Sequence, residues 1–341
     1  MRKKLKMMSL IIGLTMLTSL FAGCSAKKDD KIVIGLSLPT QQEERWVRDK
    51  EKMEAVAKEL GVELKVQVAN NDLSQQDSQA KNLIAQGVDA LIVAPQDASA
   101  AASIVDEASK EGIKVISYDR LIMNTENIDV YISFDNVKVG ELQGKYITDL
   151  VPEGNYFLMA GAPTDNNATL FKEGAMKYIQ PLVDSGKIKV LVDQPVDDWK
   201  PENALKIVEN ALTANNNKVD AILAPNDGTA GGAVQALAAQ GLAGEVPITG
   251  QDAELAGAIR IVEGTQTMTI FKDTRLLGEE AVKAAVALVK GEELEKANQT
   301  VNNASVDVPS ILLTPYAVDK DNIDELLIDS GYLEKEDVYR D

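Results

Sequence analysis

Two similar stretches of sequence indicate the fold: Val88-Asp89-Ala90-Leu91-Ile92-Val93-Ala94-Pro95-Gln96-Asp97 and, further along the chain, Val219-Asp220-Ala221-Ile222-Leu223-Ala224-Pro225-Asn226-Asp227. Both read as a buried β-strand that ends at a proline and opens into a loop with an acidic residue. Two strands of parallel sheets can resemble each other by chance, because such strands share an apolar composition. The similarity of the two stretches nevertheless favours two lobes with similar folds.

On both sides of these strands, short apolar runs alternate with segments whose apolar residues recur at helical spacing. This pattern is typical of βαβ units, so we predict an α/β fold with two doubly wound parallel-sheet lobes. Ligands of such sheets bind beyond the carboxyl ends of the strands, and two facing lobes would enclose a ligand between those ends. The predicted strands cover residues 32–36, 64–68, 90–94 and 114–118, then 156–159, 188–192, 221–224 and 248–250.

The amino terminus has the layout of an export signal, with a basic start and an apolar stretch at residues 7–22. A membrane-spanning helix is the weaker interpretation, because a bilayer needs about 20 apolar residues and this run is shorter and interrupted. We therefore expect a signal peptide at residues 1–23 that is absent from the folded protein.

The apolar stretch ends in Leu20-Phe21-Ala22-Gly23-Cys24, which resembles the bacterial lipobox, although Phe21 replaces the usual aliphatic residue. We expect Cys24 to carry lipid, residues 24–30 to form a tether, and the folded part to stay at the extracytoplasmic face of the cell membrane. An incidental cysteine near an ordinary cleavage site is the alternative. Cys24 is the only cysteine, so no intrachain disulfide can form.

The composition excludes several classes of protein. The chain contains no histidine, which rules out histidine-based triads and the usual zinc sites. It has 35 basic and 53 acidic residues, and removing the four basic residues of the signal leaves a net charge of −22, which makes nucleic acid a poor partner. No Gly-rich phosphate loop is present and nothing marks a carboxylate pair for glycoside hydrolysis, so we expect no enzyme, cofactor or metal site.

The two tryptophans are notable because each follows a predicted strand instead of falling in an apolar stripe. Trp46 comes after the first strand, and Trp199 comes after the strand near residue 190. An aromatic face stacks well on the C–H face of a sugar ring. Each indole could instead pack on the surface of its own lobe and cover a helix start.

Polar residues follow other predicted strands in the same way. A sugar hydroxyl both donates and accepts hydrogen bonds, so carboxylates combined with Arg, Lys or Asn suit it. Taken singly they have plainer explanations: Asn136 and Asp227 could cap helices, and Asp119-Arg120 could be a surface ion pair. Recurrence at six junctions favours a ligand site formed by Asp119-Arg120, Phe134-Asp135-Asn136, Asp165-Asn166-Asn167, Asn226-Asp227, Gln251-Asp252 and Lys272.

Longer strings extend these motifs: Glu44-Arg45-Trp46, Tyr118-Asp119-Arg120, Tyr131-Ile132-Ser133-Phe134-Asp135-Asn136, Asn155-Tyr156-Phe157-Leu158-Met159, Asp165-Asn166-Asn167, Pro201-Glu202-Asn203-Ala204-Leu205-Lys206, Gly250-Gln251-Asp252 and Gly264-Thr265-Gln266-Thr267-Met268-Thr269. Together they closely resemble the D-xylose-binding proteins of bacterial ABC sugar importers, a branch of the class I periplasmic sugar-binding proteins. The resemblance runs from about residue 31 to about residue 331.

The resemblance implies the class I periplasmic-binding-protein fold, in which a three-segment hinge joins two lobes. The crossings would lie near residues 134–136, 271–273 and 306–309. The N-terminal sugar-binding lobe would comprise residues 31–134 and 273–306, and the C-terminal sugar-binding lobe would comprise residues 135–272 and 307–341.

The resemblance also implies a site, with Trp46 and Trp199 on either side of a pyranose ring. It implies a monomeric lipoprotein that captures a monosaccharide, D-xylose in the first place, and delivers it to the permease and ATPase of an ABC transporter. Alternatives are a sugar sensor that signals to a chemoreceptor or sensor kinase, and a binder of another pentose or hexose. The implied ligand-binding residues are Arg45, Trp46, Asp119, Arg120, Asp165, Asn167, Trp199, Asn226, Asp252 and Lys272.

Overall fold

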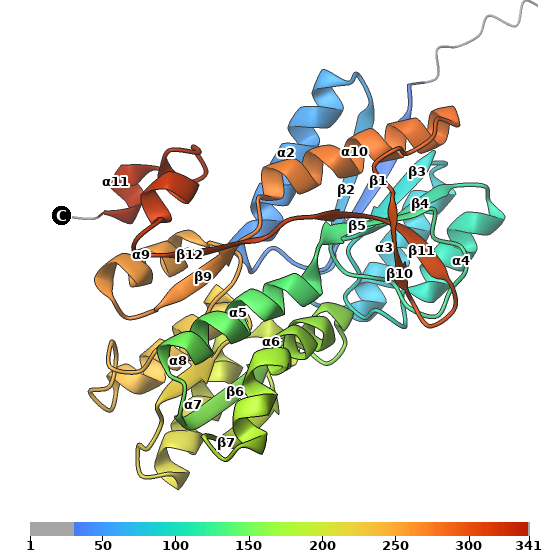
Figure 1. Cartoon of the computed structure of the whole chain (residues 1–341). Coiled ribbons are helices and arrows are strands. Elements are labelled where there is room, and N and C mark those ends of the chain that lie inside the picture. Colours follow the sequence, from blue (N-terminus) through green and yellow to red (C-terminus); the bar gives the residue numbers. More distant parts are fainter. Residues whose placement is uncertain (1–30, 340–341) are drawn as a thin grey trace, which may run out of the picture. The chain divides into compact units, whose positions relative to one another are not determined.

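The folded part of the chain consists of alternating strands and helices arranged in two lobes (Figure 1). The computed structural model describes residues 31–339. The predicted signal peptide, the tether and Cys24 lie outside these residues. The alternation, with a mainly parallel sheet in each lobe, confirms the predicted α/β class.

The first lobe is built on a sheet that helices cover on both faces. Its strands are β1 (Val33–Leu38), β2 (Glu63–Val68), β3 (Ala90–Val93), β4 (Lys114–Tyr118), β5 (Val130–Phe134), β10 (Gln299–Asn302) and β11 (Asp307–Leu313). Its helices are α2 (Glu44–Glu59), α3 (Leu73–Ala85), α4 (Ala102–Lys110) and α10 (Thr274–Lys290). The strand order is β10-β11-β5-β4-β3-β1-β2. Successive residues of β3 face opposite sides, so that Ile92 packs with α2 and α10 while Leu91 packs with α3 and α4.

The second lobe has a smaller parallel sheet, ordered β7-β6-β8, and a separate antiparallel pair, β12-β9. Its strands are β6 (Gly154–Ala160), β7 (Ile188–Pro195), β8 (Ala221–Leu223), β9 (Met268–Phe271) and β12 (Tyr316–Asp319). Its helices are α5 (Asn136–Leu150), α6 (Asn166–Asp184), η1 (Asp197–Trp199), α7 (Pro201–Ala214), α8 (Asp227–Ala238), α9 (Leu255–Glu263), η2 (Asp324–Ile328) and α11 (Lys335–Val338). Tyr156 packs between the sheet and α5 and α6, whereas Phe157 faces α7 and α8.

One predicted strand of this lobe is reduced to a single bridge. Residues 248–250 contribute only the parallel pairing of Ile248 with Ile222. The chain then turns away at Gly250, where an added β-carbon would stand 2.1 Å from the carboxylate of Asp227. The carboxylate of Asp227 therefore occupies the space beside Gly250, at the end of this short pairing.

Three connections pass between the lobes, and the third differs from the predicted one. The first lies between β5 and α5, and the second between β9 and α10. Residues 306–309 are not a crossing: residue 306 ends the turn of the β10–β11 hairpin, and residues 307–309 belong to β11. Strand β11 stays in the first lobe, pairing with β5 as far as Leu313 opposite Phe134. The chain therefore crosses at residues 314–315, before β12, and not at residues 306–309.

Short polar side chains cap the starts of several helices. The side chain of Asp135 accepts a backbone hydrogen bond at the start of α5, and Asn226 forms a reciprocal cap with Thr229 at the start of α8. The alternative prediction that Asn136 and Asp227 cap these helices is therefore wrong, because in each case the preceding residue is the cap. Both of these side chains are buried in the interior instead.

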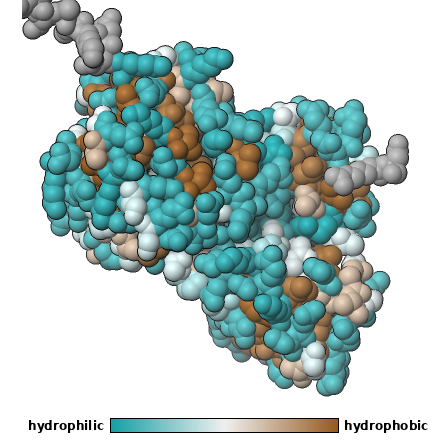
Figure 2. Space-filling view, turned by 180° about the vertical axis from the view of Figure 1, so that it is seen from behind, coloured by the Kyte–Doolittle hydropathy of each residue, from teal (hydrophilic) through white to brown (hydrophobic). Residues whose placement is uncertain are grey.

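The face shown in Figure 2 is mainly hydrophilic, with apolar residues in separate areas. Large hydrophobic side chains that are exposed lie on different elements, namely Leu60, Leu73, Leu150, Leu276, Tyr316 and Tyr339. Among residues 31–339, no helix is both long and apolar enough to cross a membrane.

Candidate ligand cleft between the lobes

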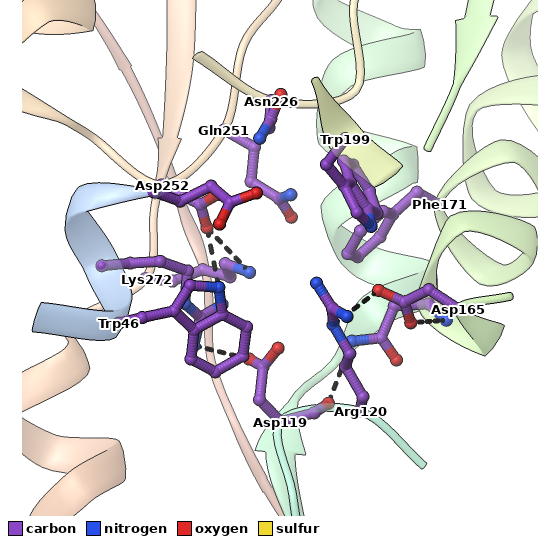
Figure 3. A pocket seen from close by; sticks show the side chains of 13 residues that line it. Trp46, Asp119, Arg120, Asp165, Phe171, Trp199, Asn226, Gln251, Asp252 and Lys272 are labelled. Carbon is purple, nitrogen blue, oxygen red and sulfur yellow. Dashed lines mark hydrogen bonds and ion pairs between the residues drawn. The ribbon is translucent and has the colours of Figure 1, made fainter. Parts of the chain in front are cut away.

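A cavity lies where the carboxyl ends of strands from both lobes meet. Figure 3 shows side chains of both lobes directed toward it. It brings together all ten residues predicted from the sequence: Arg45, Trp46, Asp119, Arg120, Asp165, Asn167, Trp199, Asn226, Asp252 and Lys272. Three further residues line it, Glu43, Phe171 and Gln251.

Each predicted residue lies just beyond a strand or in the first turn of the helix that follows. In the first lobe, Arg45 and Trp46 begin α2, and Asp119 and Arg120 follow β4 directly. In the second lobe the positions are similar: Asp165 and Asn167 at the start of α6, Trp199 at the end of η1, Asn226 before α8, Asp252 before α9, and Lys272 directly after β9. This placement is the one expected for ligand loops of α/β sheets.

Three cleft residues adopt a left-handed backbone conformation that residues other than glycine rarely take. The φ angle is 57° at Asp119, 59° at Trp199 and 92° at Asp252. For a bulky residue such as tryptophan this is an outlier, and each such position costs on the order of 1–3 kcal/mol. Backbone strain of this kind concentrates at functional sites, where the surroundings hold it in place.

The surroundings of Asp119 illustrate how this strain is held. Its carbonyl oxygen accepts hydrogen bonds from Ser133 Oγ at 2.7 Å, from Tyr131 Oη at 2.9 Å and from Asn167 Nδ2 at 2.9 Å. The third donor belongs to the second lobe. The position of Asp119 in the cleft therefore depends on the contact between the lobes.

Arg45 is a buried cation shared by three carboxylates. Its Nη2 lies 2.8 Å from Asp119 Oδ2 and 3.1 Å from Asp49 Oδ2, and its Nη1 lies 3.6 Å from Asp252 Oδ1. Burial alone would raise the pKa of Asp119, but Arg45, with Lys272 and Arg120, outweighs it and holds that pKa below its usual value. Burial raises the pKa of Asp49, behind Arg45, to about 6.

Two further ion pairs line the cleft. Arg120 Nε of the first lobe lies 2.8 Å from Asp165 Oδ2 of the second, and Lys272 Nζ lies 2.9 Å from Asp252 Oδ1. Burial raises the pKa of Asp165 in spite of Arg120. The lining thus holds three cations and three aspartates besides Glu43, so that the charges nearly cancel. Such a site suits a neutral ligand with many hydroxyl groups better than a phosphate or a bare cation.

Aromatic rings border the cleft on both lobes. The guanidinium carbons of Arg45 and Arg120 lie 4.5 Å and 5.3 Å from the centroid of the Trp46 ring, a cation–π geometry that fixes the indole. The ring of Trp199 meets Phe171 edge to face, with the centroids 6.4 Å apart and the planes at 69°. In Figure 3, Trp46 and Trp199 lie on opposite sides of the cavity.

Several buried polar atoms of the cleft have no hydrogen-bond partner among residues 31–339. The indole Nε1 of Trp199 is such a donor, and Glu43 Oε2 and Gln251 Oε1 are such acceptors. A buried polar atom left without a partner costs about 1–3 kcal/mol. Unpartnered donors and acceptors that share one cavity indicate a ligand with complementary groups.

The lobes also contact each other outside the cavity. Glu44 Oε2, at the start of α2, accepts a hydrogen bond from the backbone N–H of Leu255, the first residue of α9, at 2.8 Å. In return, the backbone N–H of Glu44 donates to Glu254 Oε1 at 3.2 Å. Neither helix is capped by the side chain of its own N-cap residue. Each helix start is therefore satisfied from the opposite lobe.

Of the three further lining residues, Gln251 belongs to a junction that the sequence predicts for the ligand site, whereas Glu43 and Phe171 were not predicted. Gln251 stands next to Asp252 and belongs to the same quoted string. Phe171 lies four residues after Asn167 on α6, a spacing that places both side chains on one helix face. Glu43 directly precedes the helix that carries Arg45 and Trp46, and nothing in its local pattern distinguishes it from a surface residue.

The chain is similar to known proteins along most of its length. Residues 34–293 match the family described as periplasmic binding protein domain. The D-xylose-binding periplasmic protein of Escherichia coli (strain K12) is 54% identical over 321 residues, which cover 94% of this chain and 97% of that protein. The D-xylose-binding periplasmic protein of Haemophilus influenzae is 50% identical over 335 residues, which cover 98% of this chain and 100% of that protein.

A solved structure extends the similarity to the fold. The carbohydrate transporter solute binding protein from Chloroflexus aurantiacus, in complex with D-glucose, matches with a TM-score of 0.85 and 36% identity. The match covers 90% of this chain and 98% of that chain. All thirteen cleft residues, from Glu43 to Lys272, fall inside the region that matches the family.

Proposed function

The chain belongs to the periplasmic binding protein family, and from this premise we propose that it captures one neutral monosaccharide, D-xylose, in the cleft between its two lobes. The observation that carries the proposal is the make-up of the cavity. Three cations and three aspartates balance each other, two indoles flank them, and unpartnered donors and acceptors come from both lobes. A pyranose has apolar C–H faces for the indoles and a rim of hydroxyls for the polar groups.

In this proposal the ten predicted residues are the ligand-binding residues. Trp46 and Trp199 stack on the two faces of the ring. The charged and amide side chains bind the hydroxyl groups, with Asp119 kept ionised as an acceptor by Arg45. No step of this scheme changes the sugar covalently, so incubation with xylose or a xyloside should yield no new product.

The choice of xylose rests on relatives that are named D-xylose-binding and are about half identical to this chain. Another pentose or a hexose is the alternative, since a more distant relative holds D-glucose. A thermal-shift panel of pentoses and hexoses tests this choice, because a ligand that binds only the folded form raises its melting temperature. D-xylose should give the largest shift. If ribose or galactose alone stabilised the protein, the xylose assignment would fail.

Delivery to an ABC transporter is the proposed use of the bound sugar. The ligand contacts both lobes, so binding favours the closed form, and the closed monomer presents a surface to the permease and its ATPase. Signalling to a chemoreceptor or sensor kinase is the second candidate. Cross-linking of the sugar-loaded protein in membranes should recover a permease subunit, whereas recovery of a receptor would favour sensing.

We propose that Cys24 anchors the protein by lipid to the extracytoplasmic face of the cell membrane. The support is the lipobox-like string ahead of Cys24 and the absence of any other cysteine. Metabolic labelling with a palmitate analogue should mark the wild type and leave a Cys24→Ala variant unmarked. An unlabelled wild type would contradict the anchor without affecting the sugar site.

A further inference from the structure

Glu43 occupies the N-cap position of α2 without acting as a cap. Its φ and ψ are −79° and 135°, as usual for an N-cap residue, yet its side chain makes no hydrogen bond to the first turn of the helix. The side chain lines the sugar cavity instead. Its position is therefore not explained by a role in starting α2.

The carboxylate of Glu43 lies among charged groups of both lobes and is bonded to none of them. Arg120 and Arg45 attract it, whereas Asp252 and Glu254 repel it. Within residues 31–339 it forms no ion pair, and its buried Oε2 accepts no hydrogen bond. Burial raises the pKa of this carboxyl, and the nearby Arg120 opposes that rise.

A buried carboxylate oxygen without a donor is costly, and the Glu43 side chain lines the cavity in which the proposed sugar would bring hydroxyl donors. Resting on the proposed function, we infer that Glu43 is a further ligand-contacting residue, whose Oε2 accepts a hydrogen bond from a hydroxyl of the bound sugar. With Arg45 and Trp46, Glu43 would bring three different groups from the start of α2 to one site: an acceptor, a cation and an aromatic face.

The inference has a direct test in two substitutions. Glu43→Leu keeps the approximate size and removes both oxygens, and it should weaken xylose binding by about 10-fold to 100-fold, the usual effect of losing a hydrogen bond to a charged group. Glu43→Gln keeps an acceptor oxygen and should lose about tenfold or less on the same basis. Glu51→Leu is the matched control, because Glu51 is exposed on the same helix and should leave the affinity unchanged.

A pH series separates a contact from a merely structural role. Protonation neutralises the carboxylate and leaves a weaker acceptor, so acidification from pH 8 to pH 5 should weaken xylose binding more in the wild type than in Glu43→Gln, which carries no charge at either pH. Melting temperatures without sugar establish that both variants are folded. If the wild type bound xylose and Glu43→Leu bound it equally well, this inference would be wrong while the proposed function stood. A wild type that bound no sugar would overturn the proposed function itself.

Discussion

Trp199 lies directly against Gly161: a β-carbon placed on residue 161 would stand 2.0 Å from Cη2 of the indole. The ring therefore occupies space that any other residue at this position would fill. Gly161 directly follows β6, so the Trp199 indole packs against the carboxyl end of this strand. Phe171 holds the same indole from its edge.

Gly161→Ala should displace Trp199 and weaken xylose binding. Forcing an extra methyl group into a packed site costs about 1–3 kcal/mol, which corresponds to roughly 5-fold to 150-fold in affinity if the indole has to move. Titration calorimetry measures the loss. Gly228→Ala is the control, because its added β-carbon would meet its nearest neighbour at an ordinary 3.6 Å. If the Gly161→Ala variant bound xylose as tightly as the wild type, the packing of Trp199 against Gly161 would not be needed for sugar binding.

Glu44→Ala should shorten the lifetime of the bound complex. It removes the acceptor for the Leu255 N–H, so that closing the lobes no longer satisfies the start of α9. Glu44 is partly exposed, so we expect a loss of only about 1 kcal/mol, which is roughly a fivefold faster release of sugar. Stopped-flow tryptophan fluorescence separates release from association, and the association rate should stay nearly constant.

Glu51→Ala, on the exposed part of α2, serves as the control for Glu44→Ala. A Glu44→Ala variant that released sugar at the wild-type rate would contradict the role of this contact in closure. A change confined to the association rate would contradict it as well, because a contact that joins the two lobes is expected to slow their separation and so the release of sugar.

Asp227→Asn should destabilise the second lobe and weaken sugar binding together. Asp227 is fully buried, and its carboxylate accepts hydrogen bonds from Gln266 Nε2 at 2.6 Å, Thr269 Oγ1 at 2.9 Å and the Glu254 N–H at 3.0 Å. Both oxygens are in use, so the amide group of asparagine must face a donor with its own NH₂. We expect a loss of about 1–3 kcal/mol in the free energy of unfolding.

Urea unfolding measures the effect of Asp227→Asn on stability, and Asp149→Asn at an exposed ion pair is the control. The affinity for xylose should fall as well, since the loop that carries Asp252 is attached to Asp227 through Glu254. Unchanged stability would show that these three hydrogen bonds are not needed to hold the loop.

Most of the cleft could be predicted from the sequence, for a physical reason. Ligand residues of α/β lobes lie at the ends of strands, and apolar strands such as β3 and β4 are easily located by their composition. Trp46 and Trp199 could be placed because both fall outside the apolar stripes and follow predicted strands. A ligand role for Glu43 could not be predicted from the sequence, because only the packed structure reveals which carboxylates lack hydrogen-bond partners.

The third crossing could not be predicted for a different reason. The pairing of β11 with β5 joins Leu313 to Phe134, two residues far apart in the chain. A local pattern identifies a strand but not the sheet it joins. The family resemblance implied a crossing near residues 306–309, where the structure instead has strand β11 of a hairpin.

Calorimetric titration of the purified protein with D-xylose measures the proposed binding itself. We expect saturable binding of one sugar per chain, weakened by roughly 1–3 kcal/mol in Trp199→Ala through lost stacking and burial. If the wild type took up no xylose, or if the Trp199→Ala variant bound it with unchanged affinity, the proposed sugar site would be wrong.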